Sequence, residues 1–138
     1  MSSFRWPVRV YYENTDAGGV VYHAEYLKFF ERARSEWLRH LGFAHPDLKA
    51  LQGIVFVVRQ MQIKYRQPAR FDELLEVETT LDELGRSKIV FNQKLKREQD
   101  VLTEATVEVV CVECEKFRPV PMPDPITTIM RQFLSETP

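Results

Sequence analysis

One long helical segment followed by a series of strands is the feature that most restricts how this chain can fold. From about residue 24 to residue 41, apolar and aromatic side chains recur at helical spacing. They are Tyr26, Phe30, Ala33, Trp37 and Leu41, with Leu27, Arg34 and Leu38 alongside. Gly42 stands just past the predicted helix, where a glycine is a common stop. Because the apolar stripe is wide and aromatic, we expect a sheet to wrap around this helix.

The segments after Gly53 alternate apolar and polar residues with the period of two that strands show. Four such segments lie in VFVVRQMQIKYRQP, LLEVETTLDELG, SKIVFNQKLKRE and LTEATVEVVCVECEKF. The first should present Val57, Arg59, Met61, Ile63 and Tyr65 on one face. An earlier strand is predicted over residues 8–13, and short helices over residues 46–52 and 126–134.

This order of elements predicts an α+β protein. One helix should cover one face of a sheet of about five strands, a common sheet size. Strands in series favour antiparallel pairing between neighbours. The 138 residues are enough for one domain with a hydrophobic core, so we expect a single domain over residues 1–138.

Charge and composition exclude several classes of function. A formal net charge of −1 argues against a broad nucleic-acid-binding surface. No apolar run is long enough for a membrane span, and residues 1–10 lack the apolar core of a signal peptide, so we expect a cytoplasmic protein. Cys111 and Cys114 are three residues apart in a predicted strand and should point to opposite faces. We therefore expect two free thiols and no metal site.

The segment YYENTDAGGVVYHAEY, residues 11–26, holds the main candidates for chemistry. Asp16 lies between a strand and a helix, where a carboxylate can act as base or nucleophile. The local pattern alone favours a turn or helix-cap aspartate ahead of Gly18. His23 enters the helix, where unpaired N–H groups and the positive helix end suit an oxygen that gains negative charge. Glycines such as Gly19 let a ligand approach the backbone.

A second, weaker candidate is the turn GRSK at residues 85–88. Arg86, Ser87 and Lys88 combine two cations with a hydroxyl, a set that can hold a phosphate. The chain contains no phosphate-binding P-loop motif and no G-x-S-x-G motif of a serine hydrolase.

The segment VYYENTDAGGVVYHAEYLKFFERARSEWL resembles the signature of the hotdog-fold acyl-CoA thioesterases. Within them it is similar to the Tol-Pal-associated group related to 4-hydroxybenzoyl-CoA thioesterase. The matching positions are Tyr12, Thr15-Asp16, Gly19-Val20-Val21-Tyr22-His23, Tyr26, Phe30-Glu31 and Ala33-Arg34. The similarity continues through FVVRQMQIKYRQPARFDELLEV and EATVEVVCV, and so covers nearly the whole chain.

The resemblance implies a hotdog fold, a five-stranded antiparallel sheet wrapped around a long central helix. It also implies an acyl-CoA thioesterase of lipid metabolism. Asp16 would be the catalytic carboxylate, His23 and Tyr12 would assist it, and the His23 backbone N–H would bind the thioester carbonyl. Gly19, Val20 and Tyr22 would contact the substrate. One position departs from the usual E-D-T-D, because Asn14 replaces the first aspartate.

The resemblance further implies a homodimer or homotetramer, with sites between subunits whose sheets pair edge to edge. No cofactor is expected, since coenzyme A is part of the substrate; Arg86, Ser87 and Lys88 would contact its phosphates. An acyl-carrier protein is the alternative acyl donor. Two other functions stay open: a non-catalytic acyl-CoA or acyl-carrier-protein binding partner of an envelope complex, and a hotdog dehydratase.

Overall fold

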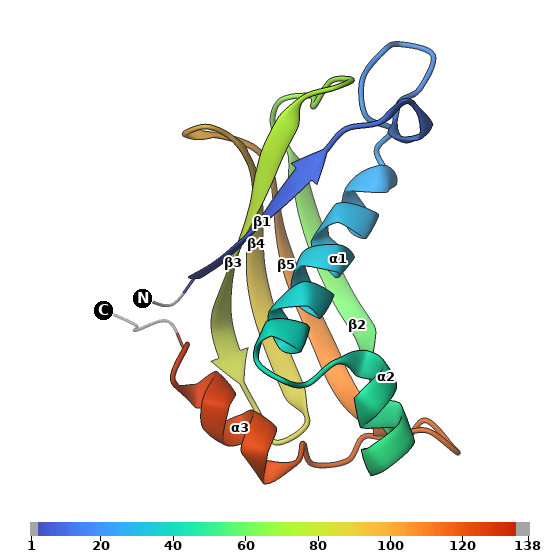
Figure 1. Cartoon of the computed structure of the whole chain (residues 1–138), viewed down its shortest axis with the longest axis vertical. Helices are drawn as coiled ribbons and strands as arrows, with labels where there is room; N and C mark the ends of the chain where they lie inside the picture. Colours follow the sequence, from blue (N-terminus) through green and yellow to red (C-terminus); the bar gives the residue numbers. More distant parts are fainter. Residues whose placement is uncertain (1–2, 135–138) are drawn as a thin grey trace.

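The computed structural model describes residues 3–134 and shows a five-stranded antiparallel sheet curved around one long helix, α1 (Glu25–His40) (Figure 1). The strands are β1 (Ser3–Arg9), β2 (Ile54–Tyr65), β3 (Leu74–Leu84), β4 (Lys88–Arg97) and β5 (Asp100–Glu113). The short helical elements are η1 (Tyr12–Asn14), α2 (His45–Asp47), η2 (Leu48–Gln52) and α3 (Asp124–Arg131). The predicted α+β class and hotdog arrangement are confirmed.

Helix α1 forms where the sequence predicts it and buries most of the predicted face, although Leu27 is 40% exposed. Its buried side chains are Tyr26, Phe29, Phe30, Ala33, Arg34, Trp37 and Leu38. Phe30 and Ala33 are fully inaccessible to solvent, because the inner face of the sheet closes over them. The predicted second helix is also present, as α2 and η2 together, and it ends at Gly53 in the left-handed conformation (φ 66°).

The inner faces of β3, β4 and β5 are also the predicted ones. Their buried residues include Leu75, Val77, Thr79, Leu81, Ile89, Phe91, Gln93, Leu95, Ala105, Val107, Val109 and Cys111. Most of them alternate with more exposed residues, as expected for strands that have one face against a core, although Val90, Val110 and Val112 are buried as well. Together with α1 they form the main hydrophobic core.

The predicted face of β2 is wrong in its first half, because the strand contains a β-bulge. Its pairing with β5 passes from Val58↔Val109 directly to Gln60↔Glu108, so Arg59 is the extra residue. A bulge reverses which side chains face the core. Val58 therefore faces inward before the bulge and Met61 after it, whereas Val57 and Arg59 do not share their face.

The predicted pairing of neighbouring strands holds only for β3, β4 and β5. The order in the sheet is β1-β3-β4-β5-β2, so β2 lies at the edge next to β5 and does not pair with β3. The connection after β2 crosses one end of the sheet. It is held there because the N–H groups of Arg66 and Gln67 donate to Leu102 O (2.8 and 3.0 Å), and that of Val10 donates to Glu73 O (3.0 Å).

Two smaller predictions have different outcomes. The strand predicted over residues 8–13 instead spans Ser3–Arg9, and Tyr12–Asn14 form a 3-10 turn. That turn is closed by Asn14, whose Oδ1 accepts a hydrogen bond from the Tyr11 N–H (2.8 Å). Cys111 and Cys114 are free thiols, as predicted, with Cys111 buried in β5 and Cys114 just beyond it. No helix within residues 3–134 has the length and apolar character needed to cross a membrane.

Candidate active site

The segment between η1 and α1 forms a small, tightly bonded loop at one end of the molecule. The Asp16 N–H donates to Val20 O (2.9 Å), and the Gly19 N–H donates back to Asp16 O (3.0 Å). Asp16 Oδ1 accepts a hydrogen bond from the Gly18 N–H (2.8 Å), so the turn-forming role considered for this aspartate is real. Gly19 has a backbone φ of 80°, a value that residues other than glycine rarely adopt.

Backbone hydrogen bonds fix this loop to the rest of the fold. The Val21 N–H donates to Ala69 O and the Tyr22 N–H to Asn14 O, each at 2.9 Å. Val20 also forms an isolated bridge with Arg70. The loop is therefore held between η1 and the connection that follows β2, and its geometry depends on segments about 50 residues apart in the sequence.

Asp16 and His23 line the same pocket, which has a volume of about 370 Å³. Its other residues are Val20, Val21, Tyr26, Tyr65, Arg66, Gln67 and Pro68. They come from the loop, the first turn of α1, the end of β2 and the connection after it. A carboxylate, an imidazole and a helix start thus meet at one hollow, an arrangement that can support acyl-transfer chemistry.

The start of α1 supplies free backbone donors to this region. The Glu25 N–H donates to Tyr22 O (2.8 Å), whereas the N–H groups of His23 and Ala24 donate to no backbone carbonyl within residues 3–134. The positive end of the helix lies at the same place. The Tyr65 hydroxyl donates to His23 O (2.7 Å) and fixes this peptide, and burial raises the pKa of the Tyr65 phenol, so it keeps its proton.

Tyr12 and Tyr22 lie outside the lining of this pocket. The Tyr12 ring stacks on Phe71 with centroids 3.9 Å apart and is 75% exposed. It makes no hydrogen bond to Asp16 among the described residues. The Tyr22 ring packs against the His23 ring, with centroids 4.5 Å apart. Of the predicted site residues, the structure therefore brings together Asp16, His23 and Val20, and leaves both tyrosines at the margin.

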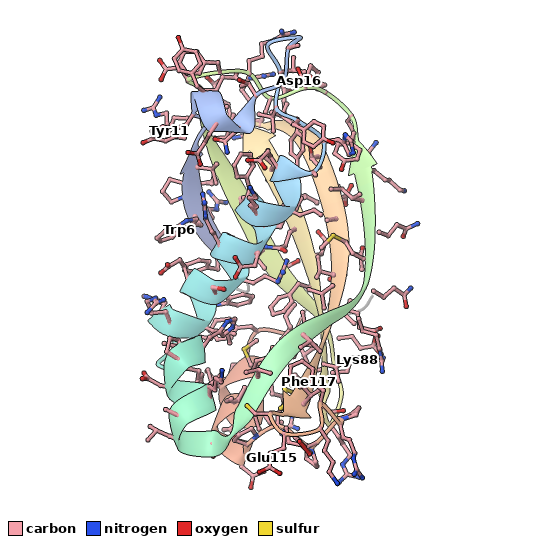
Figure 2. All side chains as sticks on the ribbon, turned by 90° about the vertical axis from the view of Figure 1, so that its right-hand side faces the viewer. Trp6, Tyr11, Asp16, Lys88, Glu115 and Phe117 are labelled. Carbon is pink, nitrogen blue, oxygen red and sulfur yellow. The ribbon has the colours of Figure 1, made fainter. Side chains whose placement is uncertain are left out.

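The turn at residues 85–88 lies towards the other end of the molecule from Asp16 (Figure 2). Lys88 Nζ pairs with Glu83 Oε1 (3.2 Å), and the Ser87 carbonyl accepts the Cys111 N–H (2.7 Å). Arg86 lines a separate hollow of about 500 Å³ together with Arg131. Within one chain, the turn and Asp16 do not form a single site.

Several pocket residues have no signal in the sequence. Tyr65, Gln67 and Pro68 reach the pocket because β2 ends beside the start of α1. Arg66 is the pocket's arginine and pairs with Glu104 (3.2 Å). In the sequence it is one of many scattered cations, and only the long-range hydrogen bonds of this connection place it near Asp16.

The sequence is similar to those of known proteins. Residues 18–104, more than half of the chain, match the Thioesterase superfamily. The chain is 48% identical to the acyl-CoA thioester hydrolase YbgC of Shigella flexneri, over 94% of this chain and 96% of that protein. It is 51% identical to the acyl-CoA thioesterase YbgC of Haemophilus influenzae, over 88% of this chain and 90% of that protein.

Solved structures show the same fold. A probable thioesterase from Bartonella henselae matches with a TM-score of 0.84 and 38% identity, over 88% of this chain and 99% of that one. A DHNA-CoA thioesterase from Staphylococcus aureus matches with a TM-score of 0.87 and 25% identity, over 96% of this chain and 90% of that one.

Proposed function

The chain belongs to the thioesterase superfamily, and we propose that it hydrolyses the thioester of an acyl-coenzyme A to a free acid and coenzyme A. Two relatives with about half of their residues identical carry this activity in their names. The observation that carries the proposal is the meeting of Asp16 and His23 in one pocket at the start of α1. Both residues are exposed enough to meet a substrate that enters from solvent.

Asp16 is proposed as the catalytic carboxylate. It either attacks the thioester carbonyl carbon itself or removes a proton from the attacking water. The thiolate of coenzyme A then leaves without a strong acid, because thiols are far more acidic than alcohols. Only one of the two carboxylate oxygens is engaged by the Gly18 N–H, so the other is available for chemistry.

The backbone at the start of α1 is proposed to stabilise the oxyanion. The N–H groups of His23 and Ala24 lack backbone acceptors within residues 3–134, and the helix end adds a positive potential. The hydrogen bond from Tyr65 to His23 O holds this peptide before substrate arrives. The His23 imidazole orients the substrate or the water. Gly19 and Val20 shape the loop beside them, and Tyr12 and Tyr22 are retained as supporting residues at the margin of the pocket.

A second copy of the chain is proposed to complete the site. Strand β2 pairs with β5 on one side, and its other edge is open for pairing with a second sheet. The Asp16 pocket lies at this edge, since Tyr65 ends β2. Arg86, Ser87 and Lys88, which lie away from Asp16 in their own chain, are retained as contacts for a coenzyme A bound to the other copy.

An acyl-CoA panel assayed by release of free thiol tests the activity. We expect Asp16→Asn to lose at least about 100-fold in rate, the usual contribution of a positioned base or nucleophile. Asp47→Asn, an exposed aspartate in α2, is the matched control and should keep the wild-type rate. An unchanged rate in Asp16→Asn would remove this residue from the mechanism. Saturable binding without turnover of any coenzyme A or carrier-protein thioester would instead favour a non-catalytic binding protein.

A further inference from the structure

Arg34 is a buried cation without a carboxylate partner. It lies on the inner face of α1 and is only 6% exposed. Its Nη1 donates to Gln93 Oε1 (2.9 Å), and no carboxylate oxygen lies within 4 Å of it among residues 3–134. Gln93 is neutral and is itself held by Phe30 O and Thr79 Oγ1. Burial lowers the pKa of the guanidinium to about 10, which reflects the cost of keeping this charge away from water.

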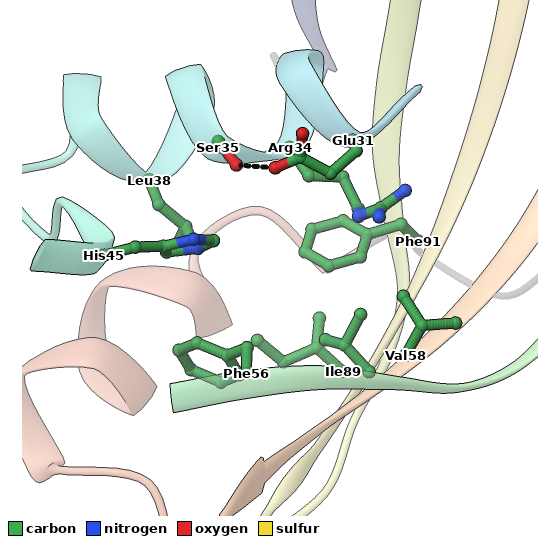
Figure 3. A pocket seen from close by; sticks show the side chains of 10 residues that line it. Glu31, Arg34, Ser35, Leu38, His45, Phe56, Val58, Ile89 and Phe91 are labelled. Atoms are coloured by element: carbon green, nitrogen blue, oxygen red, sulfur yellow. Dashed lines mark hydrogen bonds between the residues drawn. The ribbon is translucent and has the colours of Figure 1, made fainter. Parts of the chain in front are cut away.

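A pocket of about 150 Å³ lies against Arg34, between α1 and the first half of β2 (Figure 3). Its apolar walls are Leu38, Phe56, Val58, Ile89, Phe91 and Val109. A second polar group without a partner is present, since His45 also lines this pocket and its Nε2 is buried with no hydrogen-bond partner within the described residues. An unpaired cation and an unpaired imidazole nitrogen thus line one apolar hollow, where an acidic group would satisfy both.

Glu31 does not fill this role, although it lines the same pocket. Its Oε2 accepts a hydrogen bond from the Ser35 hydroxyl (2.6 Å), and its side chain is exposed to solvent (Figure 3). It forms no ion pair with Arg34 within 4 Å. Glu31 favours the charged form of Arg34 from a distance, but it leaves the buried cation without a directly bonded carboxylate.

This pocket and the Asp16 pocket lie on the same seam between α1 and β2. The Asp16 pocket is bounded by Tyr26 and Tyr65, whereas the Arg34 pocket is bounded by Leu38 and Val58 farther along the same two elements. From Tyr26 to Arg34 the helix rises about 12 Å. On the strand side, the apolar residues Met61 and Ile63 lie between the two pockets and pack against the core. An acyl group attached at Asp16 would follow this apolar seam to reach Arg34.

We propose that the Arg34 pocket receives a carboxylate carried at the far end of the substrate's acyl group, which makes an ω-carboxyacyl thioester the preferred substrate class. This inference rests on the proposed thioesterase function. The planar guanidinium offers two parallel N–H donors that match both oxygens of a carboxylate, and His45 Nε2 supplies a third contact when it carries the proton. A methyl group at the same position leaves these donors unpaired.

The test compares two acyl-CoA substrates of equal length, one with a terminal methyl group and one with a terminal carboxylate. Wild type should hydrolyse the carboxylate substrate with a kcat/KM at least about tenfold higher, the value of one charge-assisted hydrogen bond. Arg34→Met should lose this preference and keep its rate on the methyl substrate within about twofold, since apolar replacement of a buried ion is often tolerated. Arg32→Met changes an exposed arginine of the same helix and should alter neither rate.

A second variant and a binding measurement cover the remaining outcomes. Arg34→Lys keeps the charge but not the planar fork, so it should fall between wild type and Arg34→Met, and it serves if the methionine variant does not fold. Calorimetric binding of the two corresponding thioether analogues reports on the pocket without hydrolysis. If the carboxylate analogue binds more tightly in an Arg34-dependent way but neither thioester is hydrolysed, the thioesterase function is rejected and the carboxylate site is kept. Turnover or binding of both compounds without an Arg34-dependent preference would reject the carboxylate site alone.

Discussion

At the scale of single residues, Asn14 links the loop that carries Asp16 to the start of α1. It is 4% exposed, its Oδ1 accepts from the Tyr11 N–H, and its Nδ2 donates to Glu25 Oε1 (2.8 Å). The pKa of Glu25 is lowered by hydrogen bonds from Lys28 and then from Asn14. Asn14, the one departure from the expected motif, therefore uses both its amide oxygen and its amide nitrogen in hydrogen bonds.

We predict that Asn14→Asp destabilises the fold by about 1–3 kcal/mol at about pH 7, measured by urea unfolding, because two carboxylates would then face each other. The loss should shrink as the pH falls towards about 4, where carboxylates gain protons. Asn14→Ala removes the same hydrogen bonds without adding charge and should show no such recovery in acid. Equal losses for Asn14→Asp at both pH values would show that repulsion from Glu25 is not the cause.

Two buried threonines form a matched pair with opposite expectations. Thr103 and Thr79 are both fully buried in the sheet, but Thr103 Oγ1 has no hydrogen-bond partner in the described residues, whereas Thr79 Oγ1 accepts from Gln93 Nε2 (3.0 Å). We predict that Thr103→Val raises the free energy of unfolding by about 1 kcal/mol, since it removes an unsatisfied polar atom. Thr79→Val should lower it by about 1–2 kcal/mol, since Gln93 Nε2 loses one of its two acceptors. A loss in both variants would mean that Thr103 has a partner.

At the scale of elements, periodicity predicts α1 and the inner faces of β3, β4 and β5 correctly. Burial of one face places apolar residues at the regular spacing of a helix or a strand, and this spacing can be recognised in the sequence. It fails for β2, where one extra residue at Arg59 shifts the pattern by one position. A bulge leaves no fixed residue signature, so only the pairing with β5 shows it. The strand predicted over residues 8–13 also differs from the structure. The side-chain hydrogen bond of Asn14 closes a 3-10 turn at residues 12–14, and this bond is not visible in the sequence pattern.

Only those residues of the candidate site that lie close together in the sequence can be predicted from it. Asp16 and His23 lie seven residues apart around a glycine turn, and both can be selected from the sequence. Tyr65 and Arg66 cannot, because they reach the pocket through the long-range path of the connection after β2. The position of Arg34 on the inner face of α1 is predicted by periodicity, yet nothing local indicates that it lacks an acidic partner.

The connection from Arg66 to Glu73 is fixed to β4 by a double hydrogen bond. Arg97 Nε and Nη2 donate to the two carboxylate oxygens of Glu73 (2.6 and 2.8 Å), and Nη2 also reaches Pro68 O (3.1 Å). The Arg97 guanidinium holds the pKa of Glu73 below its ordinary value. This pair therefore supports the wall of the Asp16 pocket that Pro68 forms.

We predict that Glu73→Gln lowers the free energy of unfolding by about 1 kcal/mol at about pH 7. A lowered carboxylate pKa adds stability above the pKa of the unfolded chain, and this stability is lost as the pH falls through the folded value. Wild type and variant should therefore converge in acid. Glu76→Gln, which affects the exposed pair with Arg5 (3.9 Å), should show little change at any pH. A constant difference between Glu73→Gln and wild type would contradict an electrostatic origin.

At the scale of the whole molecule, the order β1-β3-β4-β5-β2 decides where the chain can meet another copy. The two edges are not equivalent, since β1 has seven residues and contains Pro7, whereas β2 has twelve residues and no proline. Proline and short length are features that discourage pairing at an edge. The exposed apolar side chains of β2, Val58 at 49% and Tyr65 at 48%, line the two pockets. The β2 edge is thus the one suited to pairing, and both pockets on the α1–β2 seam lie beside it.

We predict a dimer in which two β2 strands pair edge to edge. Light scattering after gel filtration should give at least twice the 16.3 kDa of one chain, or four times if two dimers associate. The amides of β2 that do not bond to β5 should be protected from hydrogen exchange, because the second copy supplies their acceptors. The β1 amides that face away from β3 are the internal comparison and should exchange fast. A monomer with rapidly exchanging β2 amides would contradict the predicted pairing. A dimer with unprotected β2 amides would show that the interface lies on another surface. In that case each of the two pockets would be formed by one chain alone.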